Sequence, residues 1–349
     1  MKHNFGAGPC ILPQEVMKDA AQAVLDFNGL SILEISHRSK DYVDVMEEAR
    51  NNVKKALNIP NGYTVLYLQG GASLGFLISA MNMAGKHKRA AYINTGTWSS
   101  GAIKEAKNAG LEVVEIASSA DKDFTYIPEL TNLPDNIDFL HYTSNNTIRG
   151  TQFTEIPNVN VPLVCDMSSD IFSKEFDVSK FDLIYAGAQK NLGPAGATLY
   201  IVKDSVLGNS SLNIPTYLDL KIHADKDSMF NTPPVFSVYV ANLNLRYLLK
   251  HGGVAAMEKL SKERADLLYG EIDRNPNFEG TTTVKDRSLM NVSFRLTDES
   301  KKERFDQLWN EAGVVGIKGH RSVGGYRASM YNALPLESVK VLVDVMKAL

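Results

Sequence analysis

The chain has 349 residues, of which 44% are hydrophobic and 22% charged, and its formal net charge is -3. These values are typical of an ordinary globular protein with two domains, or with one large domain and a smaller companion, and they do not indicate a nucleic-acid partner. The start of the chain has no apolar leader and no run of about 18 apolar residues occurs, so we expect a cytoplasmic protein without a membrane span.

The first part of the chain alternates between helical and strand patterns. After a polar loop, residues 41–57 place an apolar stripe on one face of a helix, and the strand 63–69 then runs directly into a helix over 70–85. Further strands are predicted at 90–96, 111–117, 138–144, 161–166, 182–187 and 197–203, with a helix at 98–110. This alternation predicts a mainly parallel sheet wrapped by helices, with ligands at the carboxyl ends of the strands.

The second part begins with an irregular stretch over 211–236, followed by a helix over 238–253 that ends at a pair of glycines. Beyond it, we predict helices at 254–275, 301–313 and 336–349, and strands at 288–296, 314–318 and 326–331. We therefore divide the chain into an N-terminal segment (1–15), a large domain (16–253) and a small C-terminal α+β domain (254–349).

Two features at strand ends are suited to binding an anion or closing a turn. Gly70-Gly71-Ala72-Ser73 joins a strand to a helix with small residues that leave backbone N–H groups free, as a phosphate site requires, although a tight turn is the more common use of such a sequence. Asp166 ends the strand 161–166 and leaves a carboxylate at the edge of the sheet. Capping of the turn that contains Ser168 and Ser169 would also explain it.

Lys190 lies in a turn rich in glycine and alanine, "AGAQKNLGPAG", at the end of the next predicted strand. An exposed charge, or a buried ion pair with Asp166, is the simpler explanation of this lysine. Pyridoxal 5'-phosphate, however, needs a lysine for its Schiff base, an acid for its ring nitrogen and an anion site for its phosphate. Trp98, in "TGTW", offers a flat surface for the ring, although an ordinary core or surface indole would also fit.

Long motifs lie along nearly the whole chain: "NFGAGPCILP", "SHRSK", "DMSSDIFSK", "IYAGAQKNLGPAGATLYIV", "SMFNTPPVFSVY" and "KGHRSVGGYRASMYNALPLE". With these motifs the sequence resembles the phosphoserine aminotransferases, which are class V aminotransferases among the fold type I pyridoxal-phosphate enzymes. The resemblance implies an α/β fold with a large, mainly parallel-sheet domain and a smaller α+β domain. It also implies a homodimer with its sites at the subunit interface.

The resemblance implies transamination between L-glutamate and 3-phosphohydroxypyruvate, giving O-phospho-L-serine and 2-oxoglutarate in serine biosynthesis. A related step, which forms 4-phosphohydroxy-L-threonine, would serve pyridoxal-phosphate biosynthesis. By the same resemblance, Lys190 forms the Schiff base, Asp166 partners the pyridine nitrogen, Trp98 stacks on the ring and Thr147 approaches the ring hydroxyl. Binding of the cofactor phosphate is implied for Ala72, Ser73 and Gln189, and for Asn231 and Thr232 of the second subunit. Binding of the acidic substrates is implied for Arg38, His320, Arg321 and Arg327.

One departure from the family concerns Ala72-Ser73, because some members carry an arginine in this loop and this chain therefore has one cation fewer there. Alternative functions are a serine–glyoxylate type aminotransferase, a cysteine desulfurase, or a non-catalytic relative that binds metabolites or proteins. The two cysteines, Cys10 and Cys165, have no zinc or redox spacing, so no metal is expected. Cys165, beside Asp166 on a strand, is poorly placed for a mobile desulfurase nucleophile. The presence of Lys190 argues against a non-catalytic relative.

Overall fold

A computed structural model describes residues 2–130 and 132–349 of the chain. Within them, a central sheet of seven strands has the order β2-β8-β7-β6-β5-β3-β4. Its strands are β2 (Tyr63–Leu68), β3 (Arg89–Asn94), β4 (Glu112–Ser118), β5 (Phe139–Thr143), β6 (Leu163–Asp166), β7 (Leu183–Gly187) and β8 (Thr198–Lys203). All neighbours pair in parallel except β8, which is antiparallel to both β2 and β7. The prediction of a mainly parallel sheet is confirmed.

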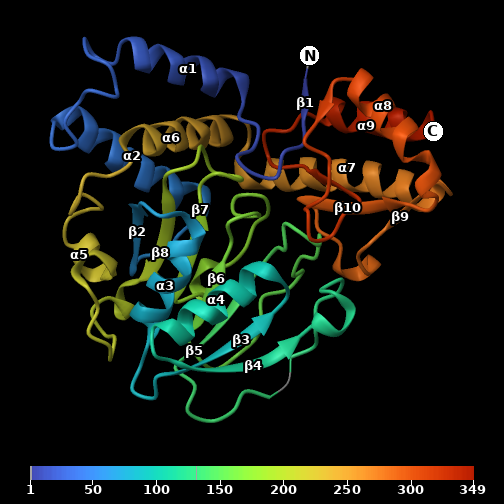
Figure 1. Ribbon diagram of the computed structural model, residues 1–349. Coiled ribbons are helices and arrows are strands. Elements are labelled where there is room, and N and C mark those ends of the chain that lie inside the picture. The colour runs from blue at the N-terminus through green and yellow to red at the C-terminus, as the bar shows by residue number, and fades with distance from the viewer. Residues whose placement is uncertain (1, 131) are drawn as a thin grey trace.

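Helices cover both faces of this sheet, because its strands alternate apolar side chains between two cores. In β2, Val65 and Tyr67 join one core, and Leu66 and Leu68 join the other. The first core is covered by α1 (Gln14–Leu25), α2 (Lys40–Ala56) and α6 (Val235–Lys250), and the second by α3 (Gly71–Met83) and α4 (Thr97–Asn108). Figure 1 shows α1, α2 and α6 grouped together, away from α3 and α4.

Two helices were not predicted. α1 buries Val16, Ala20 and Ala23, a spacing that fits one face of a helix, but its stripe is short and made of small side chains. The stretch 211–236 is mostly irregular, as predicted, and it contains the short helix α5 (Leu220–Ala224), whose first turn is capped by Asp219. No helix in residues 2–130 and 132–349 has the combined length and apolarity needed to cross a bilayer.

The C-terminal part has its own core, built on α7 (Gly253–Arg274), α8 (Lys302–Glu311) and α9 (Leu336–Lys347). An antiparallel sheet of order β12-β10-β9 packs against them, with strands β9 (Phe278–Gly280), β10 (Asn291–Leu296) and β12 (Tyr326–Ser329). This core therefore combines helices with an antiparallel sheet.

The N-terminal segment adds a strand to this small unit. β1 (His3–Asn4) pairs in parallel with β11 (Val314–Val315), and Phe5 is fully buried in the C-terminal core. The predicted strand 314–318 was therefore too long. Gly316 has φ +79°, and a Cβ added there would lie 2.7 Å from the Gly6 backbone nitrogen, so the two backbones cross closely where the strand ends.

Candidate active site

The candidate lysine and carboxylate lie at the same edge of the central sheet. Asp166 is the last residue of β6, and β7, its parallel neighbour, ends at Gly187 just before the turn that carries Lys190. Backbone hydrogen bonds hold this turn: Ala188 N donates to Ala197 O (3.0 Å), and the N–H groups of Leu192 (3.3 Å) and Gly193 (2.8 Å) both donate to Ala188 O. The predicted adjacency of the two strand ends is correct.

Lys190 contacts two other candidate residues, and one of these contacts a third. Its Nζ donates to Thr147 Oγ1 (2.6 Å) and lies 5.3 Å from the centre of the Trp98 ring, within the range of a cation–π contact. The Thr147 carbonyl in turn accepts a hydrogen bond from Arg327 Nη1 (3.2 Å). Since Arg327 belongs to β12, this cluster links the Lys190 turn to the three-stranded antiparallel sheet.

The pKa of the Lys190 amine is lowered from 10.5 to about 8. Burial is the largest cause and the positive charge of Arg327 adds to it, whereas the charges of Asp166 and Asp170 oppose the shift. An amine with this pKa is partly neutral near physiological pH, as a nucleophile or base must be. Burial also lowers the pKa of the Arg327 guanidinium. Lys190 and Arg327 are both half-buried, and the Arg327 charge is close enough to lower the pKa of the lysine.

Asp166 is held by the residue two positions further along. Its Oδ1 accepts hydrogen bonds from Ser168 N (2.9 Å) and Ser168 Oγ (2.6 Å), so the turn cap that the sequence allowed is present. Ser168 Oγ also accepts a hydrogen bond from Gly187 N (3.0 Å), which ties this turn to the end of β7. Burial raises the pKa of the Asp166 carboxyl, while Lys190 and Ser168 lower it. Its Oδ2 accepts no hydrogen bond from the described residues, so one oxygen remains available to a ligand.

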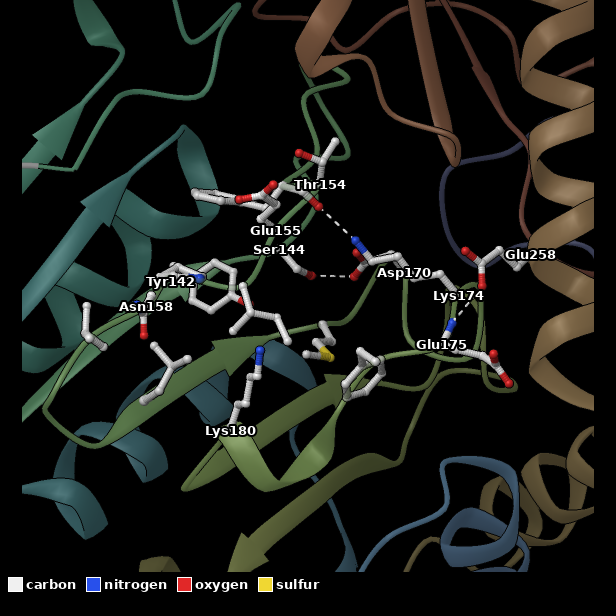
Figure 2. A pocket seen from close by; sticks show the side chains of 17 residues that line it. Tyr142, Ser144, Thr154, Glu155, Asn158, Asp170, Lys174, Glu175, Lys180 and Glu258 are labelled. Atoms are coloured by element: carbon white, nitrogen blue, oxygen red, sulfur yellow. Dashed lines mark hydrogen bonds between the residues drawn. The ribbon is translucent and has the colours of Figure 1, made fainter.

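A second buried carboxylate, Asp170, was not selected from the sequence. Ser144 Oγ donates to Asp170 Oδ1, and Gln152 Nε2 donates to its Oδ2 (3.1 Å). Burial raises the pKa of this carboxyl, and Lys174 opposes the effect. Figure 2 shows Asp170 at the wall of a cavity of about 750 Å³, into which Lys180 points; Asp166 and Lys190 do not line it. The only feature of the sequence that could have indicated Asp170 as a site residue is its position as the second aspartate of "DMSSD".

The turn before α3 has the properties of an anion site. Gly70 precedes the helix with φ +108° and gives it no side-chain cap, so the first N–H groups of α3 have no intrahelical partner. A Cβ added to Gly187, at the end of β7, would lie 3.2 Å from Ala72 N and 2.8 Å from Gln189 Oε1. Three predicted phosphate ligands, Ala72, Ser73 and Gln189, are thus near the strand end that leads to Lys190. Ser73 is exposed in the first turn of α3.

The remaining candidates lie on the surface. Asn231 and Thr232 are exposed, and the Thr232 carbonyl accepts a hydrogen bond from Gln69 Nε2 (2.7 Å), so their loop lies against the segment between β2 and α3 of the same chain. Arg38 is exposed in the loop before α2.

His320 and Arg321 are exposed in the loop before β12, where His320 Nδ1 lies 2.8 Å from Ser322 Oγ. His320 and Arg327 line one cavity of about 820 Å³, to which residues from both 122–149 and 280–327 contribute. In the part of the chain that the structure describes, no contact joins Arg38 or Arg321 to Lys190. The structure therefore brings Arg327 to the lysine but leaves the other three predicted substrate ligands apart from it.

The sequence matches one protein family over nearly its whole length. Residues 2–342 match the family model described as aminotransferase class-V. The chain belongs to the class-V aminotransferase family. A curated relative from Flavobacterium johnsoniae, named phosphoserine aminotransferase, is 58% identical over 100% of this chain and 98% of its own length.

Two solved structures support the same assignment of this class-V aminotransferase. Phosphoserine aminotransferase from Bacillus circulans subsp. alkalophilus superimposes with a TM-score of 0.96 at 42% identity, covering 100% of this chain and 98% of that one. The enzyme from Trichomonas vaginalis, solved with pyridoxal phosphate bound, gives a TM-score of 0.94 at 35% identity, covering 99% and 100%. The predicted family and the fold type I architecture are both confirmed.

Proposed function

We propose that this class-V aminotransferase catalyses reversible transamination between L-glutamate and 3-phosphohydroxypyruvate, giving O-phospho-L-serine and 2-oxoglutarate in serine biosynthesis. Full-length relatives named phosphoserine aminotransferase, at up to 58% identity, support the choice of substrates. The structural observation that carries the proposal is the Lys190 amine, which has a lowered pKa, contacts Thr147 and Trp98, and lies one hydrogen-bonded step from Arg327. The related step with 4-phosphohydroxy-L-threonine is a second reaction that we propose for the same site.

Pyridoxal 5'-phosphate is the cofactor of this enzyme, as the family and the pyridoxal-phosphate-bound relative indicate. When bound, it supplies an electron sink for the negative charge that develops at the substrate Cα. The residues present fit it well. Lys190 offers a partly neutral amine. Among the described residues, none donates a hydrogen bond to Asp166 Oδ2, and none accepts one from the buried Trp98 Nε1. Ala72, Ser73 and Gln189 would hold the phosphate at the N-terminus of α3.

Each of these side chains then has a chemical role. Lys190 would hold the cofactor covalently, and its free amine would carry the proton that leaves the substrate Cα to the cofactor. Asp166 would keep the ring nitrogen protonated through its opposite charge. Trp98 gives the ring a flat partner, and the Thr147 hydroxyl, which accepts the hydrogen bond from Lys190 Nζ, orients the amine and approaches the ring hydroxyl.

Arg327 is the proposed ligand of the substrate carboxylate. Only its Nη1 is engaged with Thr147 O, and its Nε is buried without a partner among the described residues, so part of its planar fork is available for a bidentate contact. Arg38, His320 and Arg321 would bind the substrate phosphate, and the side-chain carboxylate of glutamate would use the same donors. Their exposed positions are consistent with a site that is completed by a second subunit.

The reaction is tested by absorption spectra of the purified enzyme before and after L-glutamate, and then after 3-phosphohydroxypyruvate. We expect glutamate to change the cofactor spectrum and 3-phosphohydroxypyruvate to restore it. Borohydride reduction followed by peptide mapping should label Lys190, and Lys190→Ala should abolish turnover in a folded protein. A cofactor spectrum that does not change with glutamate but changes with serine and glyoxylate would instead indicate the serine–glyoxylate reaction. A borohydride label on another lysine would disprove the role of Lys190.

The homodimer is tested by mixing two inactive proteins, Lys190→Ala and the double variant Asn231→Ala/Thr232→Ala. If Asn231 and Thr232 act in the partner's site, heterodimers should regain part of the activity, because one of their two sites is then intact. The absence of recovery in subunits shown to have exchanged would contradict the shared site.

A further inference from the structure

The N-terminal segment runs from the small domain to the turn that carries Lys190. At the small-domain end, Phe5 N donates to Val315 O (2.9 Å), and Ser329 N donates to Phe5 O (3.2 Å). The buried Tyr331 hydroxyl then donates to Ala7 O (2.9 Å). Residues 5–7 are therefore fixed to the edge of β12 and to the segment that follows it.

At its other end, this segment contacts the backbone of the Lys190 turn through Cys10. The Cys10 backbone N–H donates to Gln189 O (3.1 Å). The Cys10 thiol has two carbonyl acceptors within reach, Lys190 O and Ile11 O (3.2 Å), and Lys190 O is the nearer of the two. In the part of the chain that the structure describes, no other residue donates to the carbonyls of Gln189 and Lys190. The approach is also close at Gly8, where an added Cβ would lie 3.5 Å from Lys190 Cγ.

The thiol is suited to donating a hydrogen bond. Burial raises the pKa of the Cys10 thiol to about 12, so the sulfur keeps its proton at physiological pH. A thiol in this state is a weak hydrogen-bond donor and a poor nucleophile. Cys10 is thus placed to hold a carbonyl rather than to react.

From these contacts we propose that Cys10 is a positioning residue, which fixes the backbone at Lys190 through the hydrogen bond from its thiol to the Lys190 carbonyl. The proposal rests on the proposed role of Lys190. The position of an amine at the end of a flexible side chain depends on where its backbone is held, and a small misplacement of a reacting group has a large effect on rate. Because the same segment is bonded to Ser329, two residues after Arg327, it also ties the lysine to the strand that carries the proposed carboxylate ligand.

The test compares Cys10→Val and Cys10→Ser in the enzyme with its cofactor bound. Valine is apolar and cannot donate a hydrogen bond, whereas serine can donate one. For Cys10→Val we expect kcat to fall about three- to tenfold, the effect of one neutral hydrogen bond, with little change in the KM for glutamate. Cys10→Ser should recover most of kcat. Equal kcat values in Cys10→Val and the unmodified enzyme, or equal losses in both variants, would overturn the proposal.

A second measurement does not depend on catalysis. Amide hydrogen exchange over residues 186–193, measured by mass spectrometry, should be faster in Cys10→Val than in Cys10→Ser and the unmodified chain, because the turn loses one of its fixed carbonyls. Ser338→Ala is the matched control: it removes the contact of Ser338 Oγ with His3 Nδ1 (3.0 Å) at the far end of the segment, and it should leave this exchange unchanged. Unchanged exchange in Cys10→Val would also overturn the proposal. If exchange over residues 186–193 is faster in Cys10→Val but the unmodified protein does not transaminate, the proposed function is wrong while the positioning contact is supported.

Discussion

Replacing Lys190 by methionine should stabilise the cofactor-free protein at neutral pH, although it removes the proposed Schiff-base residue. Burial lowers the pKa of the amine from 10.5 to about 8, so at pH 7 the folded state must keep a charged amine in a poorly hydrated place. Since one pKa unit corresponds to about 1.4 kcal/mol, this charge costs about 3 kcal/mol below the folded-state pKa. Methionine also loses the hydrogen bond to Thr147 Oγ1, worth about 1 kcal/mol, which leaves a net gain of about 2 kcal/mol.

The stability gained by Lys190→Met should decrease as the pH rises. Between the folded pKa of about 8 and the unfolded value of 10.5, the unfolded chain holds more protons, so the unmodified protein becomes more stable as the pH rises. At about pH 9.5 the remaining cost is only about 1 kcal/mol, which the lost hydrogen bond offsets. The advantage of Lys190→Met should therefore be about 2 kcal/mol at pH 7 and close to zero at about pH 9.5.

The assay is urea unfolding of both cofactor-free proteins at the two pH values, followed by circular dichroism. Lys259→Met is the control, because Lys259 is an exposed residue on α7 and its replacement should change stability by less than about 0.5 kcal/mol at either pH. The argument from burial would be refuted if Lys190→Met were less stable than the unmodified chain at pH 7. It would also be refuted if the difference in free energy of unfolding between the two proteins were the same at both pH values.

Three further predictions concern the substrate and the fold. Arg321→Ala should reduce kcat/KM most for phosphoserine, less for glutamate and hardly at all for serine, whereas Arg327→Ala should damage all three alike by a few kcal/mol; equal losses in Arg321→Ala would contradict this division. Gly75→Ala should destabilise the protein by about 1–3 kcal/mol in urea unfolding, because the added Cβ would lie 2.7 Å from the Tyr185 ring inside the α3–β7 contact. Arg264→Leu should cost about 3 kcal/mol or more, since the fully buried Arg264 donates to the carbonyls of residues 331 (2.8 Å) and 334 (2.6 Å), and an unchanged unfolding midpoint would exclude that role.

Much of the fold could be predicted from the sequence, because most of its elements carry a strong local pattern. The strands of the central sheet are short apolar runs bounded by turn residues, and α2 has a clear apolar stripe. α1 was missed because its stripe is short and consists of small residues, and the strand after α8 was made too long because its pairing partner, β1, lies at the other end of the chain. Local periodicity contains no information about a partner more than 300 residues away.

For the site, the sequence by itself determined the types of residue and their order. Asp166 and Lys190 follow two successive strands, and parallel strands bring such ends to one edge of a sheet, so their proximity follows from the pattern alone. The resemblance then added Thr147 and Arg327. Only the tertiary structure decided that the Lys190 amine contacts Thr147, that Arg327 reaches the same threonine from the small domain, and that Cys10 contacts the carbonyls of the lysine turn. These contacts, and the burial that lowers the pKa of the lysine, depend on how segments far apart in the chain pack together, which no local pattern of residues specifies.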